Sequence, residues 1–326
     1  MTVPTRYFIA GGAGFIGSHF TDRLLGDDPA ATVTLYDNFS SGREWHYEHH
    51  LQGQRLRVVR ADVKEIEALT EAMRGHDVVI HLASNPDIAR AVTEPEIDFR
   101  EGTSLTNNVV EAMRRSGTTS ILYASGSGVY GDLGEREAAE DYGPLVPIST
   151  YGASKLAGEA LISSYCHMFG FTGRAFRFGN VVGRRQTHGV GFDFLRQLLK
   201  DPRNLRILGD GTQSKSYIHV RDVIDAVLLA SRRSQERFAV YNIATDYITV
   251  TEIAQLAAEC AGLDPGQVKL EYTGGNRGWK GDVPVVRLNT DRIRSLGWKA
   301  SMNSREALRD SMMAMLQDFH AGRGWL

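Results

Sequence analysis

The sequence has few features of several large protein classes. It has only two cysteines, Cys166 and Cys260, too few for a disulfide framework, and we expect both to be buried free thiols. No apolar run approaches membrane-spanning length, and the first residues lack a signal-peptide pattern. The formal net charge is −2 with acids and bases mixed, so no basic stripe indicates nucleic acid and no polybasic cluster indicates a membrane. We therefore expect a cytoplasmic protein that binds neither.

The apolar residues of the chain form two kinds of pattern that alternate regularly along the sequence. Its 326 residues are 42% hydrophobic, enough for a substantial core in one large or two smaller domains. Apolar runs typical of strands alternate with helical patterns. The expected strands are 7–10, 33–36, 56–59, 77–82, 120–124 and 174–178, and the expected helices are 16–25, 62–73, 102–115 and 150–169. This alternation predicts a doubly wound parallel sheet, a Rossmann-type α/β fold.

Beyond residue 179 the pattern becomes less regular. Helices are expected at 192–199, at 250–261 after a capping box of Thr249 and Glu252, and at 305–319. We expect a Rossmann-type cofactor domain at 1–179 and a smaller mixed α/β substrate domain at 180–326, with a segment of about 216–245 that can return to the first domain. A cleft between two such domains is where ligands usually bind.

A glycine-rich turn follows the first expected strand. Gly11, Gly14 and Gly17 lie between the apolar run at 7–10 and the helical pattern at 16–25. In a dinucleotide site, such glycines permit the tight turn, the approach of the pyrophosphate, and close packing of helix on strand. The pyrophosphate then lies at the helix N-terminus, where free N–H groups favour an anion. The stretch therefore predicts a dinucleotide site.

Asp37 ends the next expected strand, about 20 residues beyond the glycines. A carboxylate there accepts hydrogen bonds from an adenosine ribose and repels a 2′-phosphate. We therefore predict NAD, not NADP, as the cofactor.

Tyr151 and Lys155 form a second signal. Four residues apart, they lie on one face of the expected helix 150–169. We expect the ammonium to lower the tyrosine pKa, and the positive charge of bound NAD⁺ to add to this effect. Tyr151 can then act as a base on a sugar hydroxyl near neutral pH.

A third signal is a pair of serines, Ser125 and Ser127, after the expected strand 120–124. The carboxyl ends of strands are where open α/β sheets place ligands. Either hydroxyl can hydrogen-bond a substrate oxygen as its proton leaves. The alternative is that these serines only shape the turn.

The order of these motifs resembles the extended short-chain dehydrogenase/reductase superfamily, and within it the NAD-dependent epimerases and dehydratases of nucleotide-diphosphate sugars. The Gly-x-x-Gly-x-x-Gly spacing at 11–17 and the Tyr-x-x-x-Lys pair carry the resemblance, which covers nearly the whole chain. Further similar stretches are His81–Ala83, Val129–Gly131, Arg177–Gly183, Gly209–Gln213 and Tyr217–Val223.

The resemblance implies most of the cofactor contacts. The residues expected to bind NAD are Gly11, Gly14, Phe15, Ile16, Gly17, Asp37, Asn38, Asp62, Val63, Leu82, Ala83 and Lys155. Lys155 is expected to hold the nicotinamide ribose. The resemblance also implies a homodimer through the helices at 102–115 and 150–169.

One position departs from the family. Where relatives carry a catalytic Ser or Thr three residues before the valine of Val-Tyr-Gly, this chain has Gly126. We expect Ser127 to take that role, with Ser125 as the alternative. Dehydratases of the family carry an acid pair in this region and uronate decarboxylases a Glu at position 127, and this chain has neither. That favours 4-epimerisation: oxidation at C4, rotation of the keto sugar, and return of the hydride.

The resemblance also implies the substrate contacts. Besides Ser127 and Tyr151, the expected set is Asn180, Arg185, Lys215 and Arg277. Lys215 stands where an arginine is usual, so its contact is expected to be looser. The role of Arg277 stays open because its spacing to Gly281 is unusual, and a structural ion pair is the alternative for Arg185.

We therefore expect an NAD-dependent enzyme, a nucleoside-diphosphate-sugar 4-epimerase that acts on a UDP-hexose through a 4-keto intermediate. The nearest alternative is a UDP-glucuronate 4-epimerase, in which Arg90 or Arg185 could supply a cation near C6. An alternative from another class is a catalytically silent NAD-binding sensor or scaffold. Tyr151 and Lys155 argue against it, and only Gly126 argues for it.

No metal site is expected. His46, His49 and His50 have metal-like spacing, but they lie in the variable region after Asp37 and lack a Cys or Asp partner.

Overall fold

The structure is a computed structural model that describes residues 5–323 of the chain. The chain divides into two compact units. The first contains the residues up to Val129 together with Thr150–Arg177 and Ala226–Tyr241, and the second contains Tyr130–Ser149, Phe178–Asp225 and the residues from Asn242 on. The assignment of 1–179 to the cofactor and 180–326 to the substrate stays a prediction.

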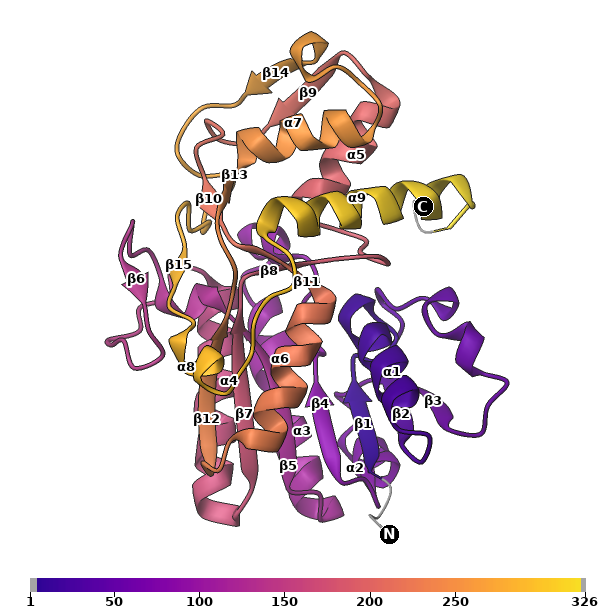
Figure 1. Ribbon diagram of the computed structural model, residues 1–326. Coiled ribbons are helices and arrows are strands. Elements are labelled where there is room, and N and C mark those ends of the chain that lie inside the picture. The colour runs from indigo at the N-terminus through magenta and orange to yellow at the C-terminus, as the bar shows by residue number, and fades with distance from the viewer. Residues whose placement is uncertain (1–4, 324–326) are drawn as a thin grey trace. The chain divides into compact units, whose positions relative to one another are not determined.

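A seven-stranded sheet organises the first unit (Figure 1). Its order is β12-β7-β5-β4-β1-β2-β3, and the pairs β1–β2, β1–β4, β2–β3 and β4–β5 are parallel. The strands are β1 (Arg6–Ala10), β2 (Thr32–Asp37), β3 (Leu56–Arg60), β4 (Val78–His81), β5 (Ser120–Gly126), β7 (Thr172–Phe178) and β12 (Phe238–Ile243). The predicted Rossmann-type fold is confirmed.

Helices follow the strands as the alternation predicts. They are α1 (Phe15–Asp27), α2 (Ile66–Met73), α3 (Ser104–Ser116), α4 (Thr150–Phe169) and α6 (Val220–Arg233). Phe8, Val79 and Ile121 of the sheet are fully buried, in one core with Leu69 of α2 and Val109 of α3. Apolar burial of this kind stabilises the layer by roughly 1.5–3 kcal/mol per large side chain.

Two helix starts differ from the expectation. The helix expected at 62–73 begins at Ile66, and the Asp62 carboxylate accepts a hydrogen bond from the Lys64 nitrogen in the preceding turn. The helix expected at 102–115 is preceded by a π-helical turn, η4 (Phe99–Thr103). Such turns are often found at functional sites.

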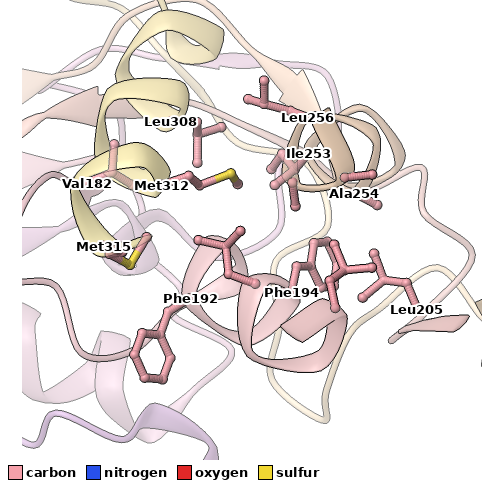
Figure 2. Close-up of a cluster of buried hydrophobic side chains, with 14 of the residues drawn as sticks. Val182, Phe192, Phe194, Leu205, Ile253, Ala254, Leu256, Leu308, Met312 and Met315 are labelled. Atoms are coloured by element: carbon pink, nitrogen blue, oxygen red, sulfur yellow. The ribbon is translucent and has the colours of Figure 1, made fainter. Parts of the chain in front are cut away.

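The second unit is a mixed α/β unit, as predicted. Its helices α5 (Val190–Lys200), α7 (Val250–Cys260) and α9 (Ser304–His320) share a core in which Phe194, Ile253 and Met312 are buried (Figure 2). The capping box of Thr249 and Glu252 is confirmed at the start of α7.

Short strand pairs complete this unit. They are β8 (Asn180–Val182) with β11 (Tyr217–His219), β9 (Asn204–Ile207) with β14 (Lys269–Tyr272), β10 (Ser214–Lys215) with β13 (Ile248–Thr249), and β6 (Glu137–Ala138) with β15 (Arg287–Leu288). A short helix, α8 (Asp291–Ser295), follows β15.

Two expectations from composition can be compared with the fold. Cys166 is buried, but Cys260 is partly exposed, so the expectation of two buried thiols is wrong for Cys260. Within residues 5–323, no helix combines the length and apolar character needed to cross a membrane.

Candidate active site

The turn after β1 has two glycines that a larger residue cannot replace without a shift of the backbone. Gly11 has a φ of +80°, and a Cβ there would lie 2.7 Å from the Ala83 nitrogen. A Cβ on Gly17 would lie 2.6 Å from the Gly12 carbonyl oxygen. The turn and the start of α1 therefore pack closely because these positions are glycine.

Gly14 differs because a Cβ there would meet only the Gly11 carbonyl oxygen, at 3.5 Å. Gly14 is the N-cap of α1 and makes no side-chain cap. The first turn, which contains the half-buried Phe15 and Ile16, has no acidic residue. A helix start with open space and no acidic residue in its first turn attracts a phosphate group through its N–H groups and dipole. These features fit the pyrophosphate of a dinucleotide.

Asp37 ends β2 and fixes the glycine turn to it. Its carboxylate accepts hydrogen bonds from the Ala13 nitrogen at 2.9 Å and the Phe39 nitrogen at 2.7 Å, and the residue is only 7% exposed. Burial raises the pKa of Asp37, although both hydrogen bonds oppose the shift. A carboxylate has about four acceptor sites, so Asp37 retains capacity for ribose hydroxyls.

Asn38 and Asp62 join the neighbouring strand ends. The Asn38 amide donates to the Asp62 carboxylate at 3.0 Å. Burial alone would raise the pKa of Asp62, but hydrogen bonds from Asn38 and from the Lys64 nitrogen outweigh it and lower the pKa. Val63 is buried in the core beneath. The structure thus brings these predicted residues together beyond the ends of β2 and β3.

Leu82 and Ala83 follow β4 and close on the same turn. Their nitrogens both donate to the Ala10 carbonyl oxygen, each at 2.9 Å. The predicted cofactor residues of β1 to β4 therefore lie at the carboxyl ends of adjacent parallel strands, where open α/β sheets bind ligands. This arrangement fits NAD.

Tyr151 and Lys155 lie in the first turns of α4. Lys155 is only 4% exposed, and its ammonium donates to the Ala124 carbonyl oxygen at 2.8 Å and lies 5.4 Å from the centre of the Tyr151 ring. The hydrogen bond to β5 fixes the lysine, so its charge is held beside the phenol. Burial lowers the pKa of Lys155 to about 8, against the influence of Asp98.

The expected lowering of the Tyr151 pKa is wrong for the protein by itself. Burial and the nearby Asp98 carboxylate raise the pKa of Tyr151 to about 12. Both effects disfavour a phenolate, and the lysine does not overcome them.

Asp98 was not identified from the sequence. It is 1% exposed and accepts hydrogen bonds from the Asn85 amide at 2.9 Å and from the Thr150 hydroxyl at 2.7 Å. Thr150 directly precedes Tyr151, so this carboxylate is anchored at the start of the helix that carries the tyrosine. An acid just before the expected helix 102–115 is typical of an N-cap. That pattern did not indicate that Asp98 would be buried at the start of η4.

Ser125 is held by a buried ion pair. Its hydroxyl donates to the Glu159 carboxylate at 2.5 Å, and the same carboxylate accepts two hydrogen bonds from Arg177, at 3.0 and 2.8 Å. All three residues are less than 5% exposed. The proton of the Ser125 hydroxyl is therefore committed to Glu159, a partner that sequence spacing did not suggest.

Gly126 and Ser127 have a different environment. A Cβ at Gly126 would meet only the Tyr151 ring, at 4.0 Å, so this position lies beside the phenol with space for a side chain. Ser127 begins η5 (Ser127–Tyr130) and is half-buried. Among the described residues, the Ser127 hydroxyl makes no hydrogen bond.

In the second unit, Lys215 and Arg277 converge on one residue. Lys215 forms an ion pair with the Asp282 carboxylate. Arg277 donates to the Asp282 carbonyl oxygen and forms an ion pair with Asp132 at 2.6 Å. The two cations that were predicted from distant motifs are thus held together by backbone and carboxylate oxygens.

Asn180 and Arg185 flank β8 in the same unit. Asn180 is exposed, and its amide donates to the Ser216 carbonyl oxygen at 3.2 Å. Arg185 is half-buried in the turn beyond β8 and has a φ of +68°. A positive φ is unusual for a residue other than glycine and is often found at binding sites.

The histidines discounted above do have an acidic partner. The side chain of Asp22 on α1 contacts both His49 and His50, so the expectation that no Asp lies near them is wrong. This partner lies 27 residues before His49 and could not be found from local spacing. His46 is buried separately, with its Nδ1 on the Ala13 carbonyl oxygen.

Comparison with known proteins supports the resemblance. Residues 7–244 match the family described as NAD dependent epimerase/dehydratase. Over 313 residues, the chain is 31% identical to the UDP-glucose 4-epimerase of Mycolicibacterium smegmatis, with 93% of this chain and 96% of that protein covered. Over 328 residues, it is 29% identical to the dTDP-glucose 4,6-dehydratase of Streptomyces griseus, with 99% and 96% covered.

A solved structure agrees with these relatives. The crystal structure of a UDP-galactose 4-epimerase superposes with a TM-score of 0.85 at 34% identity, over 96% of this chain and 99% of that one. Relatives of both the epimerase and the dehydratase kind share this chain's length and pattern. The predicted family and the predicted cofactor, NAD, are confirmed at this level. The chain belongs to the NAD-dependent epimerase/dehydratase family of enzymes that act on sugar nucleotides.

Proposed function

We propose that the protein is a nucleoside-diphosphate-sugar 4-epimerase that acts on a UDP-hexose through a 4-keto intermediate. The observation that carries this proposal is the position beside the Tyr151 ring, which Gly126 leaves open, with Ser127 next to it. Neither is an acid. Elimination of water requires an acid to protonate the departing hydroxyl. This set of side chains therefore supports oxidation and reduction at C4 without elimination.

In this proposal Tyr151 accepts the proton of the sugar 4-OH. Lys155, fixed by the Ala124 carbonyl oxygen, supplies the positive charge that favours the phenolate and also binds the nicotinamide ribose. When bound at the carboxyl ends of β1 to β4, NAD would supply reversible hydride transfer at C4 of the sugar.

Ser127 is the better candidate than Ser125 for contact with the sugar. The Ser125 hydroxyl donates to Glu159 in the interior of the first unit. The Ser127 hydroxyl has no such partner in the described part of the chain and is half-buried. A hydroxyl without a protein partner can donate to the sugar oxygen at no cost in lost hydrogen bonds.

Lys215 and Arg277 are proposed to bind the diphosphate, with Asn180 and Arg185 as further contacts of the nucleotide sugar. Cations that are already gathered on Asp282 can exchange a carboxylate for a phosphate without a large rearrangement. Lys215 provides a point charge, and Arg277 provides a planar fork.

The test is proton NMR of the anomeric region while protein with catalytic NAD is incubated with UDP-glucose, UDP-galactose or UDP-glucuronate in separate samples. We expect UDP-glucose and UDP-galactose to interconvert. Conversion of UDP-glucuronate alone would make a UDP-uronate, and not a UDP-hexose, the substrate. No conversion of any of the three, with NAD bound, would contradict the proposed substrates and favour the silent relative.

A homodimer through α3 and α4 is also proposed. Met168 and Phe169, at the end of α4, are 72% and 44% exposed, and Phe99 of η4 is 64% exposed. A second copy would bury this apolar surface. Light scattering coupled to gel filtration should give twice the 36.0 kDa chain mass. The cytoplasmic location stays a prediction.

A further inference from the structure

Three potential metal-binding side chains outside the proposed active site meet on the surface of the first unit. Asp22 lies on α1, and His49 and His50 form most of the turn η2 (Glu48–His50). One oxygen of Asp22 lies 2.9 Å from His49 Nε2 and 2.8 Å from His50 Nε2. The two imidazole rings are 4.1 Å apart, centre to centre. Adjacent residues therefore turn their rings toward the same carboxylate.

The donor atoms are close enough to share one ion. One donor atom from each residue lies within 4.8 Å of the other two. A tetrahedral Zn²⁺ has bonds of about 2.0–2.1 Å to nitrogen and oxygen, which places its ligands roughly 3.3 Å apart. Small rotations of the three side chains would separate the donors by that distance. The side chains of Asp22, His49 and His50 are 32%, 47% and 21% exposed, so an ion can enter from solvent and keep a water molecule.

The chemistry of the donors selects the kind of ion. Two imidazole nitrogens disfavour Mg²⁺ and Ca²⁺, which prefer oxygen ligands. The absence of a thiolate in this set disfavours soft ions such as Cu(I). Two nitrogens and one carboxylate suit late first-row divalent ions, Zn²⁺ among them.

We propose that Asp22, His49 and His50 form a binding site for a divalent transition-metal ion, with Zn²⁺ as the ion that fits best. The site is separate from the residues proposed for epimerisation, and the proposal does not depend on that reaction.

The position of the site gives the ion a structural effect. The segment that carries the histidines is already attached to the glycine turn, since the Arg43 nitrogen and His46 Nδ1 both bond the Ala13 carbonyl oxygen. Asp22 already holds the same segment to the middle of α1 through its hydrogen bonds with His49 and His50, and the ion would replace these by metal–ligand bonds. Binding of the ion to the folded state alone raises stability.

The test is calorimetric titration of tag-free, EDTA-treated protein with ZnCl₂. We expect one equivalent of Zn²⁺ to bind, and Asp22→Asn and His50→Gln each to weaken binding about tenfold or more, since even substitutions that only support a metal ligand cost that much. His320→Gln is the matched control, because His320 is an exposed histidine at the end of α9 and its loss should leave Zn²⁺ binding unchanged.

A second measurement protects the test against misfolded variants. Thermal unfolding without metal should be nearly the same for the wild type, His49→Gln and His50→Gln, whereas added Zn²⁺ should raise the melting temperature of the wild type and the His320→Gln control only. Co²⁺ in place of Zn²⁺ should give visible absorption bands that Asp22→Asn loses. Absence of stoichiometric binding, or equal Zn²⁺ affinity in Asp22→Asn, His50→Gln and the wild type, would overturn the proposal.

Discussion

The two units hold their candidate functional groups in different ways. In the first unit, Asp37 and Lys155 are fixed by backbone atoms at the ends of strands, through the Ala13 nitrogen and the Ala124 carbonyl oxygen. In the second unit, Lys215 lies on a short two-stranded sheet and is held by an ion pair with the Asp282 side chain. Every protein with the same fold has these backbone atoms in the same places, but an ion pair depends on two particular side chains. The first arrangement is suited to a common cofactor and the second to a variable substrate.

The largest effect should come from the first unit. Tyr151→Phe removes the proposed base but keeps the ring, so turnover should fall by about 10²- to 10⁴-fold or more. The amount of bound NAD should stay unchanged, because the cofactor residues at the ends of β1 to β4 are intact. Anomeric NMR gives the turnover, and cofactor extraction gives the NAD content. Normal turnover in this variant would refute the assignment of Tyr151.

A substitution in the second unit should mainly weaken substrate binding. Lys215→Gln removes a charged contact proposed for the diphosphate, so KM for the UDP-sugar should rise about 10- to 100-fold while kcat changes little. Lys200→Gln, at an exposed lysine of α5, is the control and should leave both constants unchanged. A fall in kcat with an unchanged KM would place Lys215 in the chemistry instead.

Two neighbouring serines, Ser125 in β5 and Ser127 in η5, test whether a hydroxyl serves structure or substrate. Ser127→Ala should lower kcat about tenfold with little change in stability. Ser125→Ala should do the reverse: it leaves the buried Glu159 carboxylate with one hydrogen bond fewer and should cost about 1–3 kcal/mol of unfolding free energy. Steady-state rates and urea unfolding of both variants separate the cases. Exchanged phenotypes would make Ser125 the sugar contact.

The smallest expected effect concerns Asp98, which we regard as a positioning residue. Burial is the main cause of the raised pKa of Tyr151, and the negative charge of Asp98 raises it further. Asp98→Asn should therefore lower that pKa. The phenolate then forms at lower pH, so the acidic limb of the profile, in which activity rises as Tyr151 loses its proton, should move down by about one pH unit. The Asn side chain keeps the shape of the contacts with Asn85 and Thr150. The pH profile of kcat measures the shift, and a merely structural role would lower activity without moving the limb.

Local patterns were sufficient to predict most strands and helices of the first unit. The glycines, Asp37 and the Tyr-x-x-x-Lys pair each lie in or beside one expected strand or helix, and those elements are present. Thr150–Phe169 is helical as the pattern predicted. Even the choice of NAD followed from one acid at one strand end.

Contacts between distant segments could not be predicted in this way. Asp98 directly precedes a π-helical turn and bonds Thr150 at the start of α4, and no apolar period shows such a turn. Asp282 pairs with Lys215 although the two residues lie 67 positions apart in the sequence. Asp22 contacts two histidines that lie beyond β2 in the sequence. The pKa of Tyr151 depends on burial and on Asp98, and both belong to the folded unit.

The buried pair of Glu159 and Arg177 has a consequence for the way this sequence can change over time. The pair joins α4 to β7, and both side chains are almost wholly buried. Replacing either residue alone would leave an uncompensated buried charge, at a cost of about 3–5 kcal/mol, a large part of the stability of a typical domain. Substitutions at the two positions should therefore occur together in related sequences, and Ser125 should vary with them.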